Sequence, residues 1–381
     1  MKKGVFAHGV MWFGAAVSVA EIEAGLQSGG NWAALLFGHL LGGVLLFAAG
    51  LLGAWTGENA METTRGTFGG RGMCFFAVLN VVQLVGWTTV MLSQGTAAVT
   101  ALSGGLPPVA CTAGLAFLIA AWVWIGMENA HHVATVAMVL LAGLATVLTV
   151  RLLLLPASAT PAPDLDFGPA FELSVAMPLS WLPLISDYTR QSTRPVACTA
   201  ASAVVYTIVS VWMYAVGMLL SRCGADGLTG GILQCGLGLA GLVVVVVSTV
   251  TTTFFDAYSA GESLKAITDG GEGRDGKAGK GLDPKLTGAV VCAVGAVLAL
   301  TGVVDRYVEF LYAIASVFAP MAAVLLVNRY VVRRRCVVWN FCSWATGTAA
   351  YYLTGEMFWS PTVTSMAVAG TSALLAFRYR S

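Results

Sequence analysis

Long apolar stretches follow one another along the whole chain, and short polar or Gly/Pro-rich breaks separate them. A helix needs about 20 apolar residues to cross a bilayer, and the breaks divide the chain into twelve such segments. They lie near residues 5–29, 31–54, 72–98, 109–127, 130–153, 169–188, 195–220, 231–258, 284–304, 306–328, 336–354 and 361–379. Transmembrane strands alternate apolar and polar residues, whereas the run from Gly241 to Val247 does not. The pattern therefore predicts an all-α, polytopic membrane protein with twelve transmembrane helices.

The positive charges support this number of spans, because cytoplasmic loops are enriched in Lys and Arg. With both termini inside, every Lys and Arg except Arg151, Arg222 and Arg306 falls on the cytoplasmic side. A wrong number of spans would scatter these residues over both sides. We therefore expect both termini in the cytoplasm.

Composition narrows the class of protein further. The chain is 57% hydrophobic and 10% charged, while soluble domains carry roughly 25% charged residues. The expected solvent is therefore the lipid bilayer. The net charge of +1 and the lack of a basic stripe argue against a nucleic-acid partner. No HExxH motif or similar constellation favours a membrane-embedded enzyme.

The remaining loops and cysteines add little chemistry. Residues 269–283 form the least hydrophobic stretch and are expected to be a cytoplasmic linker. No soluble domain interrupts residues 1–381, so we expect a single transmembrane domain without an obligate protein partner. Cys223 and Cys235 share a predicted external loop and are candidates for a disulfide; small buried thiols are the alternative.

Two spans contain helix-breaking sequences at related positions. The small residues from Gly14 to Ala16 favour unwinding of the first span, and Pro178 and Pro183 break the sixth. Broken spans in corresponding positions of two halves indicate an inverted-repeat transporter with a binding site at mid-membrane. The expected parts are repeat one at about 5–155, repeat two at about 169–328, and two extra helices at 336–379.

Polar residues in the first and eighth spans are candidate ligands. Ser18 and Glu21 lie mid-span in the first, where a packing seam with an interfacial carboxylate is the alternative. In the eighth span, Ser248, Thr249 and Thr252 share a helical face, with Asp256 one turn further. Such oxygen ligands suit a hard cation, although a Ser/Thr face can also hydrogen-bond a neighbouring helix.

The third span carries Asn80, Gln83 and Trp87 on one face. An amide and a flat aromatic ring on one face can pair with and stack on a planar heterocycle. An interhelical amide bond beside a packed Trp is the alternative. His39, in the second span, is either a proton-sensitive group or a packed neutral imidazole.

Several motifs occur in order along most of the chain. They are Ala24-Gly, Asn31-Trp-Ala-Ala-Leu-Leu-Phe-Gly-His-Leu, Thr64-Arg-Gly-Thr-Phe-Gly, Val85-Gly-Trp87, Ile185-Ser-Asp-Tyr-Thr-Arg190, Ser248-Thr and Tyr258-Ser. At these residues the chain resembles the nucleobase–cation symporter-1 family. It looks closest to the cytosine-permease-like branch of hydroxymethylpyrimidine permeases of the CytX type.

The resemblance implies a LeuT-like fold of two inverted five-helix repeats plus two C-terminal helices. It also implies alternating access, with a planar substrate held between spans one, three, six and eight. Expected substrate-binding residues are Ser18, Glu21, Gln83, Trp87, Met177, Trp181, Thr252 and Asp256. Expected sodium ligands are Ala15, Ser18, Ser248 and Thr249, with Na⁺ or H⁺ as coupling ion and no other cofactor.

The chain departs from the family pattern at three positions. Met91, Val250 and Phe254 stand where family members often carry amides. Glu21 and Asp256 are candidate replacement acceptors, which would suit an aminopyrimidine. We therefore expect a symporter of the bacterial inner membrane that imports hydroxymethylpyrimidine or a related thiamine precursor. A cytosine, purine or allantoin permease is the alternative, and a channel is the alternative outside this class.

Overall fold

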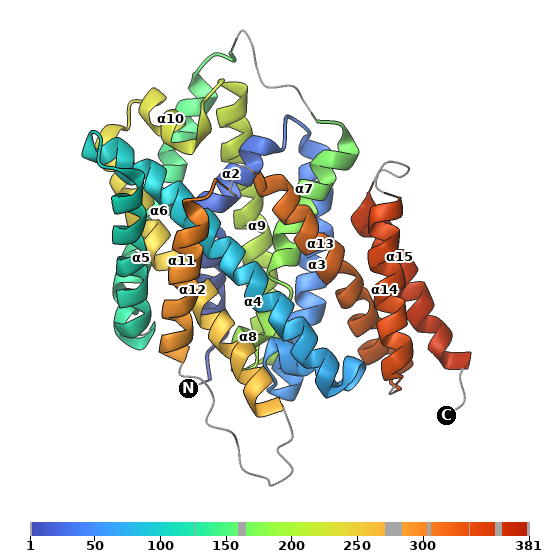
Figure 1. The fold of residues 1–381 in the computed structure, drawn as a ribbon. Coiled ribbons are helices and arrows are strands. Elements are labelled where there is room, and N and C mark those ends of the chain that lie inside the picture. Colours follow the sequence, from blue (N-terminus) through green and yellow to red (C-terminus); the bar gives the residue numbers. More distant parts are fainter. Residues whose placement is uncertain are drawn as a thin grey trace.

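The structure is a computed structural model that describes residues 2–125, 127–158, 165–270, 284–302, 306–334, 336–354 and 360–378. Its elements in chain order are α1 (Val5–Ala16), α2 (Val19–Gln27), α3 (Trp32–Thr56), α4 (Ala60–Ser103), α5 (Pro108–Ile125), α6 (Met127–Leu154), α7 (Phe167–Ser180), α8 (Ile185–Thr189), α9 (Pro195–Arg222), α10 (Gly227–Gln234), α11 (Gly238–Gly270), α12 (Pro284–Ala299), α13 (Tyr307–Leu326), η2 (Val327–Val332), α14 (Val337–Leu353), α15 (Pro361–Leu374) and η3 (Leu375–Arg378). The described chain is thus helical almost throughout, as predicted (Figure 1).

Each of the twelve predicted segments contains a helix, but the lengths differ from the prediction. Within the described residues, seven helices are long and apolar enough to cross a membrane, or eight if the bent pair α1 and α2 counts as one span. The others are shorter, such as α15 with 14 residues, or broken, such as α7 and α8. These helices support a multi-pass membrane protein.

Two predicted boundaries are wrong. The segment 231–258 is divided, because Gly236 and Gly238 adopt positive φ angles of 72° and 55° and end the short helix α10 before α11 begins. The segment 72–98 belongs to a helix of 44 residues, which starts at Ala60 and bends at Gly69 (φ 72°, ψ 176°). The linker predicted at 269–283 lies almost entirely outside the described residues.

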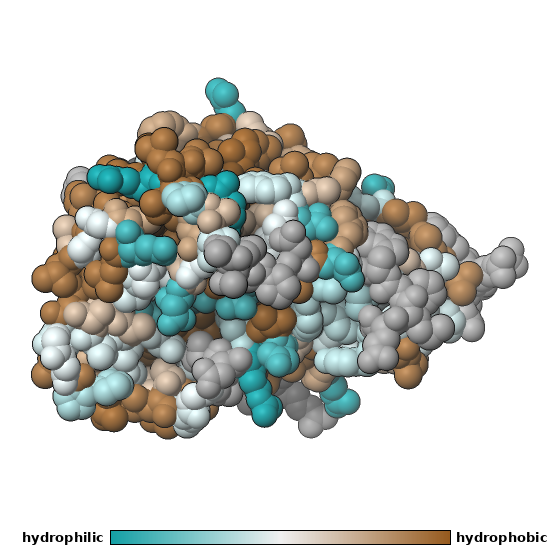
Figure 2. Space-filling model, turned by 90° about the horizontal axis from the view of Figure 1, so that it is seen from above, coloured by the Kyte–Doolittle hydropathy of each residue, from teal (hydrophilic) through white to brown (hydrophobic). Residues whose placement is uncertain are grey.

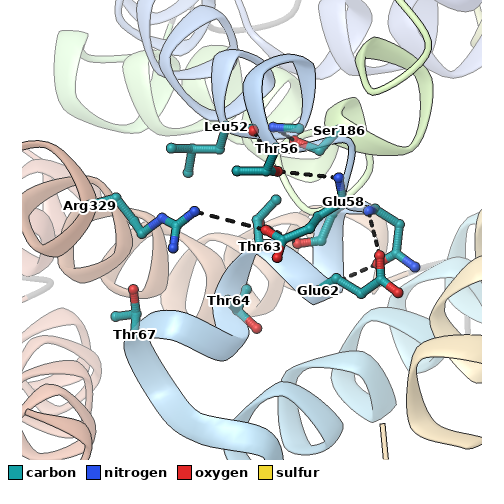
Figure 3. Close-up of polar contacts among 12 residues, drawn as sticks. Leu52, Thr56, Glu58, Glu62, Thr63, Thr64, Thr67, Ser186 and Arg329 are labelled. Carbon is teal, nitrogen blue, oxygen red and sulfur yellow. Dashed lines mark hydrogen bonds and ion pairs between the residues drawn. The ribbon is translucent and has the colours of Figure 1, made fainter. Parts of the chain in front are cut away.

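Local capping explains why α4 begins at Ala60. The Asn59 side-chain oxygen accepts from the backbone N–H of Glu62 at 2.8 Å. The Glu62 carboxylate in turn accepts from the backbone N–H of Asn59 at 2.8 Å. This reciprocal pair satisfies two helix-start donors. Figure 3 shows the same region, where Arg329 reaches from η2 toward Glu58, with 3.9 Å between the charged atoms.

Both spans predicted to be broken are broken. The helices α1 and α2 meet at an angle of 52°, and the Ser18 hydroxyl caps α2 by accepting from the Ala20 amide at 3.2 Å. In the sixth span, α7 contains Pro178 and ends at Ser180, and a turn leads to the five-residue helix α8. Both breaks leave backbone groups free of helical hydrogen bonds at the middle of the bundle.

The helices pack with the reciprocity expected of two inverted repeats. The broken pair α1 and α2 packs along α9, and the broken pair α7 and α8 packs along α3. Likewise α4 packs on α12 and α5 packs on α11, while α4 and α11 contact each other extensively. Each broken span therefore lies on the second helix of the other repeat, which gives a LeuT-like 5+5 arrangement.

Close helix crossings depend on glycine, as its abundance predicts. A Cβ on Gly217 of α9 would lie 2.0 Å from the Ile22 carbonyl oxygen, and a Cβ on Gly25 of α2 would lie 2.2 Å from the Tyr214 carbonyl oxygen. Any larger residue there would force the backbones of α2 and α9 apart.

The extra helices α14 and α15 pack on each other and on α13 at one side of the bundle (Figure 1). Glu172 at the start of α7 fixes this pair, since its carboxylate accepts from the Ser360 hydroxyl, from the Thr362 amide at 3.0 Å and from the Thr362 hydroxyl at 2.7 Å. We call the end of the bundle where α1 begins the inner end and the opposite one the outer end.

Exposed apolar side chains cover the sides of the bundle, for example Phe117 and Leu153. Figure 2 looks onto the outer end and shows hydrophilic residues over the middle of the face, with hydrophobic residues mainly toward its edges. This distribution is that of a protein whose flanks contact lipid and whose ends contact water.

Candidate functional site

A pocket lies at the middle of the bundle, where the two broken spans face α4 and α11. Its volume is about 40 Å³. The lining residues are Ala15, Ser18, Ala20, Glu21, Leu84, Trp87, Met91, Met177, Ser180, Trp181, Leu184, Thr252, Phe255 and Asp256. The pocket thus contains seven of the eight predicted substrate-binding residues, all except Gln83. Since 40 Å³ is too little for a heterocycle, side chains must move to admit one.

Aromatic rings form the walls of the pocket. Trp87 packs edge-on against Phe310, with ring centroids 5.4 Å apart. Trp181 follows α7 and packs edge-on against Phe255, with centroids 6.3 Å apart. Two flat indole rings that line one pocket suit a planar ligand.

Asp256 of α11 brings a carboxylate into this apolar pocket. The residue is 8% exposed, and it makes no hydrogen bond or ion pair within the described part of the chain. A buried carboxylate without a donor is costly unless a ligand or proton satisfies it. Asp256 is therefore the pocket's available acceptor.

Glu21 of α2 differs from Asp256, because both of its oxygens already accept hydrogen bonds. The Tyr206 hydroxyl donates to one oxygen at 2.7 Å, and the Ser210 hydroxyl lies 2.7 Å from the other. Both partners lie on α9, and Glu21 is 1% exposed. Glu21 is therefore buried where α2 packs on α9, which agrees with the packing-seam alternative, and it also lines the pocket.

The network continues beyond Ser210 through the bundle. His39 Nε2 lies 2.7 Å from the Ser210 hydroxyl oxygen, and His39 Nδ1 lies 2.8 Å from the Ser174 hydroxyl oxygen. Glu21, Ser210, His39 and Ser174 come from α2, α9, α3 and α7, so the chain of contacts joins both broken spans. Sequence analysis did not single out Tyr206 and Ser210. Their hydroxyls at i and i+4, on one face of α9, are the signal that could have found them.

Gln83 lies just behind the pocket. Its amide nitrogen donates to Asn80 Oδ1 at 2.8 Å and to the Ser180 carbonyl at 3.0 Å. Asn80 in turn donates to the Ser263 hydroxyl of α11 at 2.8 Å. In this conformation the two amides bridge helices, which is the alternative considered from the sequence.

The predicted sodium ligands are divided between two places. Ala15 and Ser18 line the pocket, whereas Ser248 and Thr249 do not. Both are buried on α11, and the Thr249 side chain packs against α4, where a Cβ on Gly95 would lie 2.9 Å from it. The Thr249 hydroxyl has no hydrogen-bond partner among the residues that the structure describes.

A polar vestibule of about 390 Å³ lies on the outer side of the pocket. Glu23, Gln27, Gln94 and Asp226 contribute its polar lining. Tyr307 and Val19 line the vestibule where it meets the pocket, since Val19 precedes the pocket residue Ala20.

The inner side of the pocket is filled by aromatic rings. Trp12 packs edge-on against Trp181 at 5.4 Å, Tyr188 at 5.8 Å and Tyr206 at 5.7 Å between ring centroids. No space for water remains among the rings around Trp12, Trp181, Tyr188 and Phe255. The pocket is therefore closed toward the inner end, and the vestibule lies toward the outer end.

Cys223 and Cys235, the candidates for a disulfide, are both buried free thiols in the structure, which is the alternative considered from the sequence. Burial raises the pKa of the Cys235 thiol, and the neighbouring Cys223 adds to the rise. A higher pKa keeps the thiol protonated and slow to react.

Three solved structures share this architecture over nearly all of the chain. An inward-facing conformation of Mhp1 is 15% identical, with a TM-score of 0.79, and the match covers 99% of this chain and 91% of that one. A closed conformation of Mhp1, a nucleobase-cation-symport-1 family transporter with bromovinylhydantoin bound, is 17% identical, with a TM-score of 0.75 over 99% and 92%. A substrate-bound, outward-open Na⁺-coupled sialic acid symporter is 13% identical, with a TM-score of 0.72 over 98% and 90%.

No protein-family model and no curated protein sequence matches the chain. The structural matches show the fold, which is the predicted LeuT-like one. These structural neighbours are transporters rather than enzymes.

Proposed function

We propose that this protein is a cation-coupled secondary transporter that imports a planar heterocycle, specifically hydroxymethylpyrimidine or a related thiamine precursor, across the bacterial inner membrane, with both termini cytoplasmic. The observation that carries the proposal is the Asp256 carboxylate, which has no hydrogen-bond partner among the described residues and lies in a pocket that Trp87 and Trp181 also line. A ring that stacks on indole and donates from an amino group satisfies both features. An aminopyrimidine has this chemistry.

The fold favours transport over conduction. Its site lies at two broken helices, with a vestibule on one side and an aromatic plug on the other. Such a site can open to one side at a time. The coupling ion in this proposal is Na⁺ or H⁺, with Ala15, Ser18, Ser248 and Thr249 as sodium ligands once α11 and the first break approach each other.

Uptake of radiolabelled hydroxymethylpyrimidine into proteoliposomes tests the proposal. We expect saturable uptake that an inward cation gradient stimulates and that unlabelled cytosine, purines or allantoin inhibit weakly. Stronger inhibition by one of these would assign the alternative substrate class. Uptake that does not saturate would indicate a channel and contradict the proposal.

Asp256→Asn tests the key contact. It removes the charge and turns one acceptor into a donor, and a hydrogen bond to a charged group contributes about 1.5–3 kcal/mol. We therefore expect affinity to fall about tenfold to a hundredfold. Asp166→Asn, at an exposed position before α7, is the matched control and should leave affinity unchanged. Unchanged affinity in Asp256→Asn would contradict the assigned role of this carboxylate.

A further inference from the structure

The contacts from Glu21 to Leu35 form one continuous chain of polar atoms, and their hydrogens can be counted. The chain runs from Glu21 Oε2 to Ser210 Oγ (2.7 Å), His39 Nε2 (2.7 Å), His39 Nδ1, Ser174 Oγ (2.8 Å) and the Leu35 carbonyl oxygen (2.7 Å). Each of these four contacts needs one hydrogen between its two heavy atoms.

The Leu35 end of the chain fixes the histidine tautomer. A carbonyl oxygen only accepts, so the single hydroxyl hydrogen of Ser174 occupies the 2.7 Å contact to Leu35. The 2.8 Å contact between Ser174 and His39 must then be filled by a hydrogen on Nδ1. His39 Nδ1 also lies 3.2 Å from the Leu35 oxygen, which fits a donor at this nitrogen.

At the Glu21 end, the two contacts made by Ser210 need two hydrogens, but its hydroxyl supplies only one. Ser210 has a single hydroxyl hydrogen but lies 2.7 Å from both Glu21 Oε2 and His39 Nε2. If Ser210 donates to Glu21, then His39 needs a second hydrogen on Nε2. If Ser210 donates to His39, then Glu21 needs a carboxyl hydrogen. Either way, the contacts require one additional proton.

Neighbouring groups do not supply this proton. The Tyr206 hydroxyl donates to the other Glu21 oxygen, that of Tyr214 donates to the Leu173 carbonyl, and that of Tyr307 donates to the Ala20 carbonyl. The other titratable groups nearby are the acids Glu23, on α2, and Asp256, across the pocket on α11. The ion pairs Arg190–Glu262 and Arg329–Glu58 lie elsewhere in the bundle.

We infer that Glu21 and His39 together bind one exchangeable proton through Ser210, and that this proton is taken up and released with the substrate. The second clause rests on the proposed function. The two arrangements interconvert when the Glu21 carboxyl hydrogen moves to Ser210 Oγ while the Ser210 hydrogen moves to His39 Nε2. One O–H bond is exchanged for one N–H bond, and the net charge of the pair does not change. Because Glu21 lines the pocket, substrate and proton occupy adjoining positions.

Infrared spectroscopy of the purified protein tests the proton site without any substrate. With isotope-labelled histidine, raising the pH from about 5 to about 10, a range that brackets imidazole and perturbed carboxyl groups, should change a carboxyl and an imidazole band together. Glu21→Gln should abolish this coupled change, because the glutamine side chain can donate to Ser210 but has no proton that titrates in this range. Ser210→Ala should separate the two bands. Ser202→Ala is the matched control, since Ser202 lies on α9 beside another histidine, His8, at 3.3 Å.

Transport measurements then test the coupling. In wild type and in the control Ser202→Ala, an inward proton gradient without sodium should accumulate substrate, while Glu21→Gln should lose this accumulation. A coupled titration in a protein that transports no pyrimidine would support the proton site and contradict the proposed substrate. No titration at Glu21 and His39, or bands unchanged in Glu21→Gln, would overturn the inference, as would accumulation driven by protons in Glu21→Gln.

Discussion

Tyr307 on α13 donates a hydrogen bond of 3.1 Å to the carbonyl oxygen of Ala20 on α2. Ala20 lines the pocket, and Tyr307 lines the vestibule outside it. The carbonyl lies in the first turn after the break, and the bond holds that turn against α13. This contact therefore forms part of the barrier between the vestibule and the pocket.

Tyr307→Phe should weaken this barrier. One neutral hydrogen bond contributes about 1 kcal/mol, which is roughly a fivefold change in an equilibrium constant. We expect labelled substrate to dissociate about fivefold faster from the purified protein. Tyr352→Phe is the control, because Tyr352 also makes one hydrogen bond, to Ser316 at 2.9 Å, but lies away from the pocket. An equal effect of both variants would show that the bond has no role in closure.

Gly217→Val tests the close crossing of α2 and α9. Its side chain would overlap the Ile22 carbonyl and the Leu26 amide, which are backbone atoms that cannot rotate away. Overpacking costs about 1–3 kcal/mol when only side chains shift, so a larger loss is expected here. The melting temperature in detergent should fall by several degrees or more. Gly143→Val is the control, since nothing lies within 4 Å of a Cβ there.

The sequence predicted the broken spans and most of the pocket because these features have local causes. Pro178 and Pro183 each remove a backbone donor, so two of them five residues apart disrupt a helix without help from distant residues, and a carboxylate such as Asp256 is costly inside a bilayer. The spacing of Thr252 and Asp256 by one helical turn also fixes their common face. These relations need no knowledge of how distant helices pack.

The sequence could not predict the partners of Glu21, because they depend on helix packing. Whether Glu21 faces Ser210 depends on the crossing of α2 and α9, and residues 189 positions apart meet there. Gln83 shows the same limit: its face was predicted, but Ser180 of another helix accepts its hydrogen bond. The start of α11 was also missed, because the apolar pattern continues through the turn at Gly236.

Ser248→Ala and Thr249→Ala test the proposed sodium ligands separately. If Thr249 turns its unpartnered hydroxyl to the ion, each variant should lower the apparent sodium affinity about tenfold or more, while uptake at saturating sodium is retained. Thr253→Ala is the control, because Thr253 is equally buried on α11 and its hydroxyl donates to the Thr249 carbonyl at 2.7 Å. Unchanged sodium dependence in both variants would remove this pair from the ion site.

Arg190 and Glu262 join α8 to α11 at the inner end, with 2.8 Å between their charged atoms and side chains 17% and 14% exposed. The nearby Tyr188 hydroxyl contacts the Ser259 hydroxyl at 3.1 Å. If inward opening of the pocket separates α8 from α11, Arg190→Gln should favour opening by about 1 kcal/mol, roughly fivefold.

The rate at which a thiol reagent labels Ser259→Cys measures this opening, because Ser259 is fully buried in the closed structure. The background is the same protein without the introduced cysteine. Labelling should be about fivefold faster in Arg190→Gln and should return toward the original rate when Arg190→Glu is combined with Glu262→Arg. Arg194→Gln, at an exposed site before α9, should change nothing. Equal labelling in all variants would mean that the ion pair stabilises the inner end without controlling its opening.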